Sequence, residues 1–123
     1  MHLGQEDLPV AAARRIAPEL IIGASSHSLE EALAAQAAGA GYVNIGPIFP
    51  TATKPDAVFL GVEAIRRITP HLTIPWSAMG GINGGNIAQV VARGARHPAV
   101  VSAVTAASDV TAAAWVLRKA IIS

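Results

Sequence analysis

Short apolar runs alternate with helical patterns along the chain. The first run covers residues 20–24 and precedes a helical pattern over residues 28–38, in which Ser28 and Glu31 have the spacing of a capping box. The second run, at residues 42–46, is followed by a long loop rich in Pro and Thr. These patterns predict two successive units of one strand and one helix.

The rest of the chain continues this alternation. The further predicted elements are, in order, a helix over residues 62–68 ended by Pro70, a strand over 75–79, a helix over 86–92 stopped by Gly94, a strand over 99–104, and a helix over 110–121 capped by Asp109. Strands that are apolar throughout, with helices between them, indicate a parallel sheet covered by its helices. We therefore expect an α/β fold of about four β/α units in a single domain over residues 1–123, and both a barrel and an open sheet fit this pattern.

The composition is that of a core-forming chain. Of its 123 residues, 52% are hydrophobic and 14% are charged, so the chain must bury much of its surface. The length is short of the roughly 250 residues of a complete (β/α)8 barrel. The net charge is +1 and the basic residues are scattered, which argues against a nucleic-acid partner and favours a small anion as ligand.

The chain contains no cysteine, which excludes disulfides and thiolate metal ligands and fits a reducing compartment. Its longest apolar stretches are interrupted by Gly, Pro or a charge before the roughly 20 residues that a membrane span needs. No signal-peptide pattern opens the sequence. We therefore expect a cytoplasmic protein that does not interact with a membrane.

Polar residues follow the predicted strands, where the loops of β/α folds carry function. Ser25 and His27 come after the first strand and directly before a helix N-terminus, so His27 is a candidate acid or base. Equally, Ser28 can be a helix cap and His27 an exposed loop residue. Asp7, in the segment HLGQED, offers a carboxylate to Mg2+, and a solvated surface acid fits that position as well.

The loop at residues 46–56 is the most informative stretch. Thr51, Thr53 and Lys54 give it two hydroxyls and an ammonium group, and three prolines stiffen it. Phosphate oxygens bind such donors, although Pro and Thr are also ordinary turn residues. The segments GGIN, at residues 80–83, and VVSA, at residues 100–103, add backbone N–H groups where barrels commonly bind phosphate. The combination favours a site for a phosphorylated small molecule.

The ordered segments HLGQED, GASSHS, GPIFPTATK, MGGING and VVSAV resemble the later half of thiamine phosphate synthases, over nearly the whole chain. The PTATK loop is the most specific of them. The resemblance implies the C-terminal part of a (β/α)8 TIM barrel with parallel strands. It also implies a transferase of thiamine biosynthesis, which joins hydroxymethylpyrimidine pyrophosphate to thiazole phosphate and gives thiamine phosphate and pyrophosphate, with Mg2+ as cofactor.

The same resemblance implies roles for individual residues. Lys54 and Ser25 would be catalytic donors to the pyrophosphate, and Asp7 would be a ligand of Mg2+. Substrate phosphates would be bound by side-chain and backbone donors, namely Thr51, Thr53, Lys54, Gly81, Val101 and Ser102. The pyrophosphate would leave first and the substrates would supply their own nucleophile, in keeping with the lack of a nucleophile–base pair in the sequence.

The sequence also departs from that family. The N-terminal strands, which in the family bring a Gln/Arg/Lys loop and a further Asp, are absent, so we expect an incomplete active site that a second copy or a partner chain completes. Gly41, Trp76-Ser77 and Arg96-His97-Pro98 also differ from the usual residues. Two alternatives stay open: a thiazole tautomerase of the same fold with His27 as the acid/base, and a phosphate-binding fragment without turnover.

Overall fold

The computed structural model describes residues 1–123 and contains one parallel sheet of five strands. The strands are β1 (His2–Leu3), β2 (Gly23–Ser26), β3 (Tyr42–Ile45), β4 (Trp76–Met79) and β5 (Pro98–Ala99). They pair in chain order, and every pairing is parallel. The parallel pairing is the one expected from the alternation of apolar runs and helical patterns, and β1 precedes the four predicted units.

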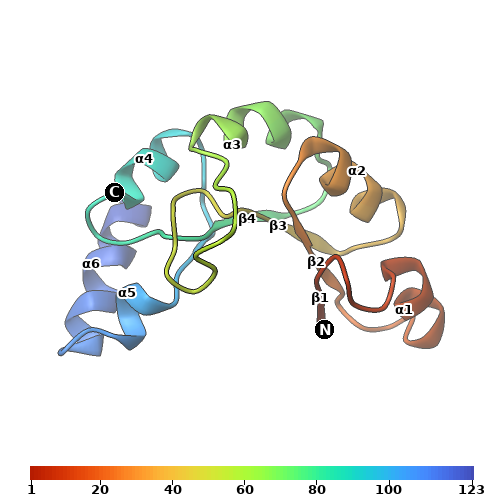
Figure 1. Ribbon diagram of the computed structural model, residues 1–123, viewed down its shortest axis with the longest axis horizontal. Coiled ribbons are helices and arrows are strands. Elements are labelled where there is room, and N and C mark those ends of the chain that lie inside the picture. Colours follow the sequence, from red (N-terminus) through yellow and green to blue (C-terminus); the bar gives the residue numbers. More distant parts are fainter.

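Helices connect the strands and cover one side of the sheet. They are α1 (Val10–Ile16), α2 (Leu29–Ala37), α3 (Glu63–Ile68) with the 3-10 turn η1 (Thr69–His71), α4 (Ile87–Ala92), α5 (Ser102–Thr105) and α6 (Val110–Ile122). Figure 1 shows an arch with α2, α3 and α4 along its outer side and with α1 and α6 at its two ends. None of these helices has the length and hydropathy that a transmembrane span requires.

The main core lies between the sheet and the outer helices. Ile45 of β3, Ile65 of α3 and Val90 of α4 are completely buried in it, and Leu117 of α6 extends it toward the C-terminal end. Burial of this apolar surface is the main force that holds the helices against the sheet. The core therefore belongs to the outer layer of the arch and leaves its inner face free for other residues.

Side-chain burial alternates along the central strands. In β3, Val43 is fully buried whereas Tyr42 and Asn44 stay partly accessible, and in β4 the buried Ala78 follows the partly accessible Ser77. Successive residues of a strand point to opposite faces of the sheet. The inner face of the arch consequently carries Tyr42, Asn44 and Ser77, and the outer face carries the buried Val43 and Ala78.

Two predicted helix starts are confirmed. The Ser28 hydroxyl accepts a hydrogen bond from the N–H of Glu31 at 3.1 Å, and the Asp109 carboxylate accepts one from the N–H of Ala112 at 2.9 Å. The other half of the capping box at α2 is displaced by one residue, because Glu31 Oε2 accepts from the N–H of His27 at 2.7 Å and not from Ser28. Both caps satisfy N–H groups that have no partner within the helix.

The predicted strand over residues 99–104 is wrong beyond Ala99. The strand β5 ends there, and the N–H groups of Val104 and Thr105 donate to the carbonyl of Val101, which starts the short helix α5. The apolar residues of this run fit either structure, because Ala103 and Val104 pack on the main core from the helical turn and Val100 packs on it from the segment before the turn. Periodicity over so few residues does not separate the two.

Three smaller differences concern boundaries. The strand predicted at residues 20–24 lies later in the chain, at β2. The helix α1 was not predicted, since its short Ala-rich sequence lacks a capping residue and follows Pro9. Pro70 does not end the local helical structure, because it lies inside η1 directly after α3. Gly94 does stop α4, as predicted, and has φ +96°.

Candidate functional site

A cleft of about 150 Å3 opens at the carboxyl ends of β2, β3, β4 and β5. Consecutive parallel strands end at the same edge of a sheet, so the loops that follow them meet there. The sequence-predicted residues that line this cleft are Ser25, His27, Thr51, Thr53, Lys54, Gly81, Val101 and Ser102. The structure therefore brings together every candidate residue except Asp7.

The loop after β3 is held against the end of β4. The N–H of Ile48 donates to the carbonyl of Met79 at 2.9 Å, and the N–H of Phe49 donates to the carbonyl of Gly80 at 3.1 Å. Gly81, with φ +66°, follows this contact, and a Cβ at that position would lie 2.5 Å from the carbonyl oxygen of Pro50. Only glycine allows the loop and the turn to approach so closely.

Hydrogen-bond donors without protein partners gather in the cleft. Lys54 forms no salt bridge, and the N–H groups of Gly81 and Val101 donate to no protein acceptor. The hydroxyl oxygen of Thr51 accepts from the N–H of Thr53 at 3.2 Å, which leaves the hydroxyl hydrogen of Thr51 free to donate. No Asp or Glu lines the cleft. Free donors and an unneutralised ammonium group are the environment in which a phosphate group binds.

Ser25 is held in place by the N-terminal segment. Its hydroxyl lies 2.9 Å from Nε2 of His2, and its carbonyl accepts a hydrogen bond from the Gln5 side chain at 2.7 Å. Nδ1 of His2 in turn lies 3.1 Å from the Tyr42 hydroxyl. Partial burial lowers the pKa of His2, the ammonium group of Met1 lowers it further, and the carboxylate of Asp7 opposes both effects. His2 is therefore biased toward its neutral form.

His27 lines the cleft beside Ser25 and has a carboxylate partner. Its Nδ1 lies 2.9 Å from Oε2 of Glu31, one helical turn away. A carboxylate in this position places the proton of a neutral imidazole on Nδ1 and leaves Nε2 as an acceptor. Both side chains are partly exposed. The pair has the geometry of a general base, and equally that of a helix-capping contact.

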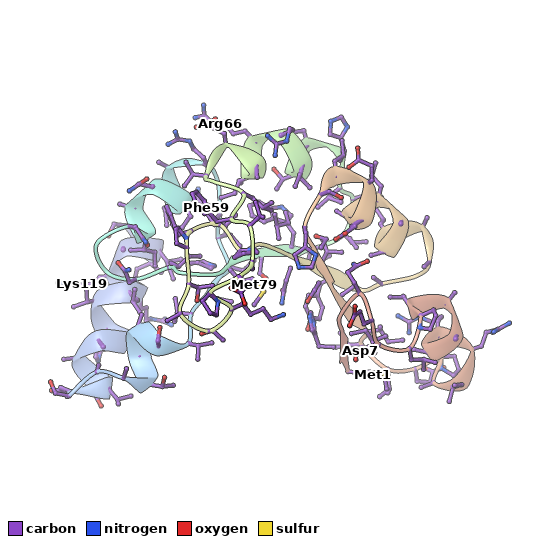
Figure 2. The ribbon with its side chains drawn as sticks, viewed as in Figure 1. Met1, Asp7, Phe59, Arg66, Met79 and Lys119 are labelled. Atoms are coloured by element: carbon purple, nitrogen blue, oxygen red, sulfur yellow. The ribbon has the colours of Figure 1, made fainter.

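Asp7 lies outside the cleft. Its Oδ2 accepts a hydrogen bond from the N–H of Gly4 at 2.7 Å, and it lines a second hollow together with Glu30 and Glu31. Figure 2 shows Asp7 at the β1 end of the arch, apart from Met79, which lines the cleft. No group of three His, Cys, Asp or Glu side chains could hold a metal ion. Of the candidate residues only Asp7 carries a carboxylate, and a hard cation such as Mg2+ would need further oxygen ligands beside it.

The sequence analysis missed a polar row on the inner face of the sheet. Ser25, Asn44 and Ser77 occupy matched positions of β2, β3 and β4, and the Ser77 hydroxyl donates to Oδ1 of Asn44. Asn44 also lines the cleft, and its Nδ2 has no protein partner. The signal was present in the sequence, because polar and apolar residues alternate in the segment YVNI and Ser77 interrupts the apolar segment WSAM.

Sequence comparison identifies relatives of this chain. The family model described as "Thiamine monophosphate synthase" matches residues 1–104. The thiamine-phosphate synthase of Chloroflexus aurantiacus is 53% identical over 119 residues, which are 96% of this chain and 55% of that protein. The corresponding protein of Pyrococcus abyssi is 51% identical over 121 residues, which are 98% of this chain and 58% of that protein.

The solved structures give the same result. The thiamine phosphate pyrophosphorylase from Pyrococcus furiosus superimposes with a TM-score of 0.91 at 47% identity, over 98% of this chain and 58% of that one. A 3-hexulose-6-phosphate synthase superimposes with a TM-score of 0.73 at 21% identity, which shows the shared fold alone. The five strands thus correspond to part of a TIM barrel, and the chain spans little more than half the length of these relatives. Residues 1–104 carry the family's pattern, and the chain belongs to the thiamine monophosphate synthase family.

Proposed function

We propose that this chain forms the phosphate-binding part of a thiamine phosphate synthase, which joins hydroxymethylpyrimidine pyrophosphate to thiazole phosphate. One observation carries the proposal: Thr51, Thr53, Lys54, Gly81 and Val101 line one cleft that contains no acid, and the N–H groups of Gly81 and Val101 have no protein acceptor. Two phosphorylated substrates need such a concentration of donors. The identity of about half of all aligned residues with proteins of that name supports the same reaction.

The proposed chemistry depends on charge stabilisation. As the bond between the pyrimidine methylene and the pyrophosphate breaks, the electron pair leaves with the pyrophosphate, whose negative charge grows. Lys54 and Ser25, which both line the cleft, would stabilise that charge through the ammonium group and the hydroxyl. Thr51, Gly81 and Ser102 would bind the phosphate of the thiazole substrate, which supplies the nucleophile for the new carbon–nitrogen bond.

Asp7 is the residue of this chain that would contribute to a Mg2+ site. When bound, Mg2+ would neutralise charge on the pyrophosphate oxygens. The segment that carries Asp7 also contacts the cleft, because the Gln5 side chain donates to the carbonyl of Ser25. A single carboxylate from this chain leaves most ligand positions to the pyrophosphate, water and other residues.

The test combines substrate turnover with anion binding. We expect the protein, supplied with both substrates and Mg2+, to form thiamine phosphate that mass spectrometry detects, and calorimetry to register pyrophosphate binding. Lys54→Ala should weaken that binding by about 10- to 100-fold, because it removes a charge-assisted hydrogen bond. Lys119→Ala removes the same charge from α6, away from the cleft lining (Figure 2), and should leave the binding unchanged.

Each other result has a definite meaning. If the protein binds pyrophosphate but forms no thiamine phosphate, the chain by itself binds phosphate groups without catalysing the reaction. If the Lys54→Ala and Lys119→Ala variants bind pyrophosphate equally well, the cleft is not the pyrophosphate site.

A second candidate function is a tautomerase that acts on a thiazole carboxylate. The observation in its favour is the contact of 2.9 Å between His27 Nδ1 and Glu31 Oε2 at the rim of the cleft. A proton-shuttling reaction needs such a base but has no need for the Lys54 ammonium. Isomerisation of the thiazole substrate that persists in Lys54→Ala and disappears in His27→Ala would favour this function over the synthase.

We also propose that a second polypeptide surface completes the site. Large apolar side chains are exposed at both ends of the arch, with Ile16 and Ile21 near α1 and Trp115, Val116 and Ile122 on α6. The outer strands β1 and β5 each have one unpaired edge. Light scattering after size exclusion should therefore give a dimer or a larger assembly, whereas a stable monomer at micromolar concentration would contradict association with a second copy.

A further inference from the structure

Three side chains from three neighbouring strands form a connected chain of hydrogen bonds on the inner face of the arch. Tyr42 of β3 lies 3.1 Å from Nδ1 of His2 on β1, and Nε2 of His2 lies 2.9 Å from the hydroxyl of Ser25 on β2. The Tyr42 and His2 rings are stacked, with their centroids 5.8 Å apart. The chain ends at Ser25, which lines the cleft.

The path across β2 exists because of Gly23. In the register of the sheet, Gly23 lies between His2 and Tyr42, so the Tyr42 side chain has to cross it to reach β1. A Cβ at position 23 would lie 2.0 Å from Cζ of Tyr42. Tyr42 and His2 meet only because this position carries no side chain.

The direction of the hydrogen bonds follows from the chemistry of the three groups. A neutral imidazole has one N–H donor and one acceptor nitrogen. The phenol of Tyr42 is more acidic than the alcohol of Ser25 and is the better donor to the acceptor nitrogen. Nδ1 of His2 then accepts from Tyr42, and the proton on Nε2 is donated to Ser25 Oγ. The hydroxyl hydrogen of Ser25 stays free.

We propose that Tyr42 and His2 are positioning residues that hold the Ser25 hydroxyl as a hydrogen-bond donor to a phosphate or pyrophosphate oxygen in the cleft. The inference deepens the proposed function and rests on it for the identity of the anion. In the opposite arrangement the Ser25 proton would point to His2, and the serine oxygen would present only lone pairs to the anion. The lowered pKa of His2 supports a neutral imidazole, because the charged form would fix a proton on both nitrogens.

The first test reads the arrangement without any ligand. Nitrogen NMR of the free protein, labelled in histidine, should show the proton of the His2 ring on Nε2 and an unprotonated Nδ1. Tyr42→Phe keeps the stacked ring but removes the hydroxyl, so the variant should lose the preference for this tautomer. A proton on Nδ1 in the unchanged protein would overturn the proposal, whether or not the protein binds pyrophosphate.

The second test uses pyrophosphate binding in a double-mutant cycle. Tyr42→Phe should weaken binding by about 3- to 10-fold, the effect of one hydrogen bond, and Ser25→Ala by more. In the Ser25→Ala background, Tyr42→Phe should have no further effect, because the phenol acts only through the serine. In the Lys54→Ala background, its effect should persist in full. A purely structural role of Tyr42 would weaken binding equally in both backgrounds, and that result would overturn the proposal.

Discussion

Replacement of Gly81 by alanine tests how strictly the cleft depends on the contact between two loops. Gly81 has φ +66°, and its missing Cβ would lie 2.5 Å from the Pro50 carbonyl oxygen. Because ordinary contact begins near 3.4 Å, the alanine has to displace the loop after β3 by about 0.9 Å, the difference between the two distances. Displacement of a reacting or catalytic group by about 1 Å can reduce a reaction rate by about 100-fold, and the displaced loop carries Lys54, which we assign to the pyrophosphate.

The substitution also has a cost in stability that can be separated from the displacement. A left-handed backbone costs a residue with a Cβ about 1–2 kcal/mol. Gly94 provides the matched control, because it has φ +96° and a Cβ there would meet no atom within 4 Å. Both variants should therefore show a similar backbone strain, which lowers the melting temperature by roughly 4 °C for each kcal/mol.

Two measurements separate the loss of binding from the loss of stability: calorimetry of pyrophosphate binding, and thermal melting. We expect Gly81→Ala to lose most of its pyrophosphate affinity and to melt below Gly94→Ala, which should keep the affinity of the unchanged protein. If Gly81→Ala binds pyrophosphate as tightly as Gly94→Ala does, the close approach of the two loops is not what assembles the site, and the reasoning fails.

Other predictions concern single contacts. Ser28→Ala removes the cap of α2 and should lower the free energy of unfolding by about 1 kcal/mol in urea titrations, whereas Ser28→Asp should retain it. The folded pKa of His2 lies below its ordinary value of 6.5, so the native state binds fewer protons than the unfolded state. The free energy of unfolding should therefore increase with pH up to about 6.5 and then level off. In urea titrations, His2→Gln should not show this increase. Asn44→Ala removes a free amide donor from the cleft lining and should weaken substrate binding in calorimetry, whereas Gln89→Ala on α4, outside the cleft, should not.

Much of the fold follows from local signals in the sequence. Ser28 and Asp109 cap their helices as predicted, because an N-cap depends on the residues of a single turn. The central strands were also predicted within a few residues, since their apolar runs face a helical layer. Residues 99–104 show where this reasoning ends: an apolar run that packs on a core can do so as a strand or as a helical turn, and only the tertiary contacts decide.

The candidate site was predictable in its composition but not in its connections. Thr51, Thr53 and Lys54 are donors whatever their neighbours, and strand order alone brings them to the same edge as Gly81. The partners of Ser25 could not be predicted, because Tyr42 reaches His2 across a strand through the space left at Gly23. Such a contact depends on register and on a missing side chain.

Backbone hydrogen bonds join the loop after β3 to the strands on both sides of it, and on the β2 side the N–H of Gly46 donates to the carbonyl of Ser26. Ile48 and Phe49 are bonded to Met79 and Gly80, and the Asn86 side chain donates to the carbonyl of Gly81. These bonds need no residue from elsewhere in a barrel. Under the proposed function, substitutions in the remaining strands of a barrel would therefore change selectivity for the heterocycle and leave the phosphate-binding loops unchanged.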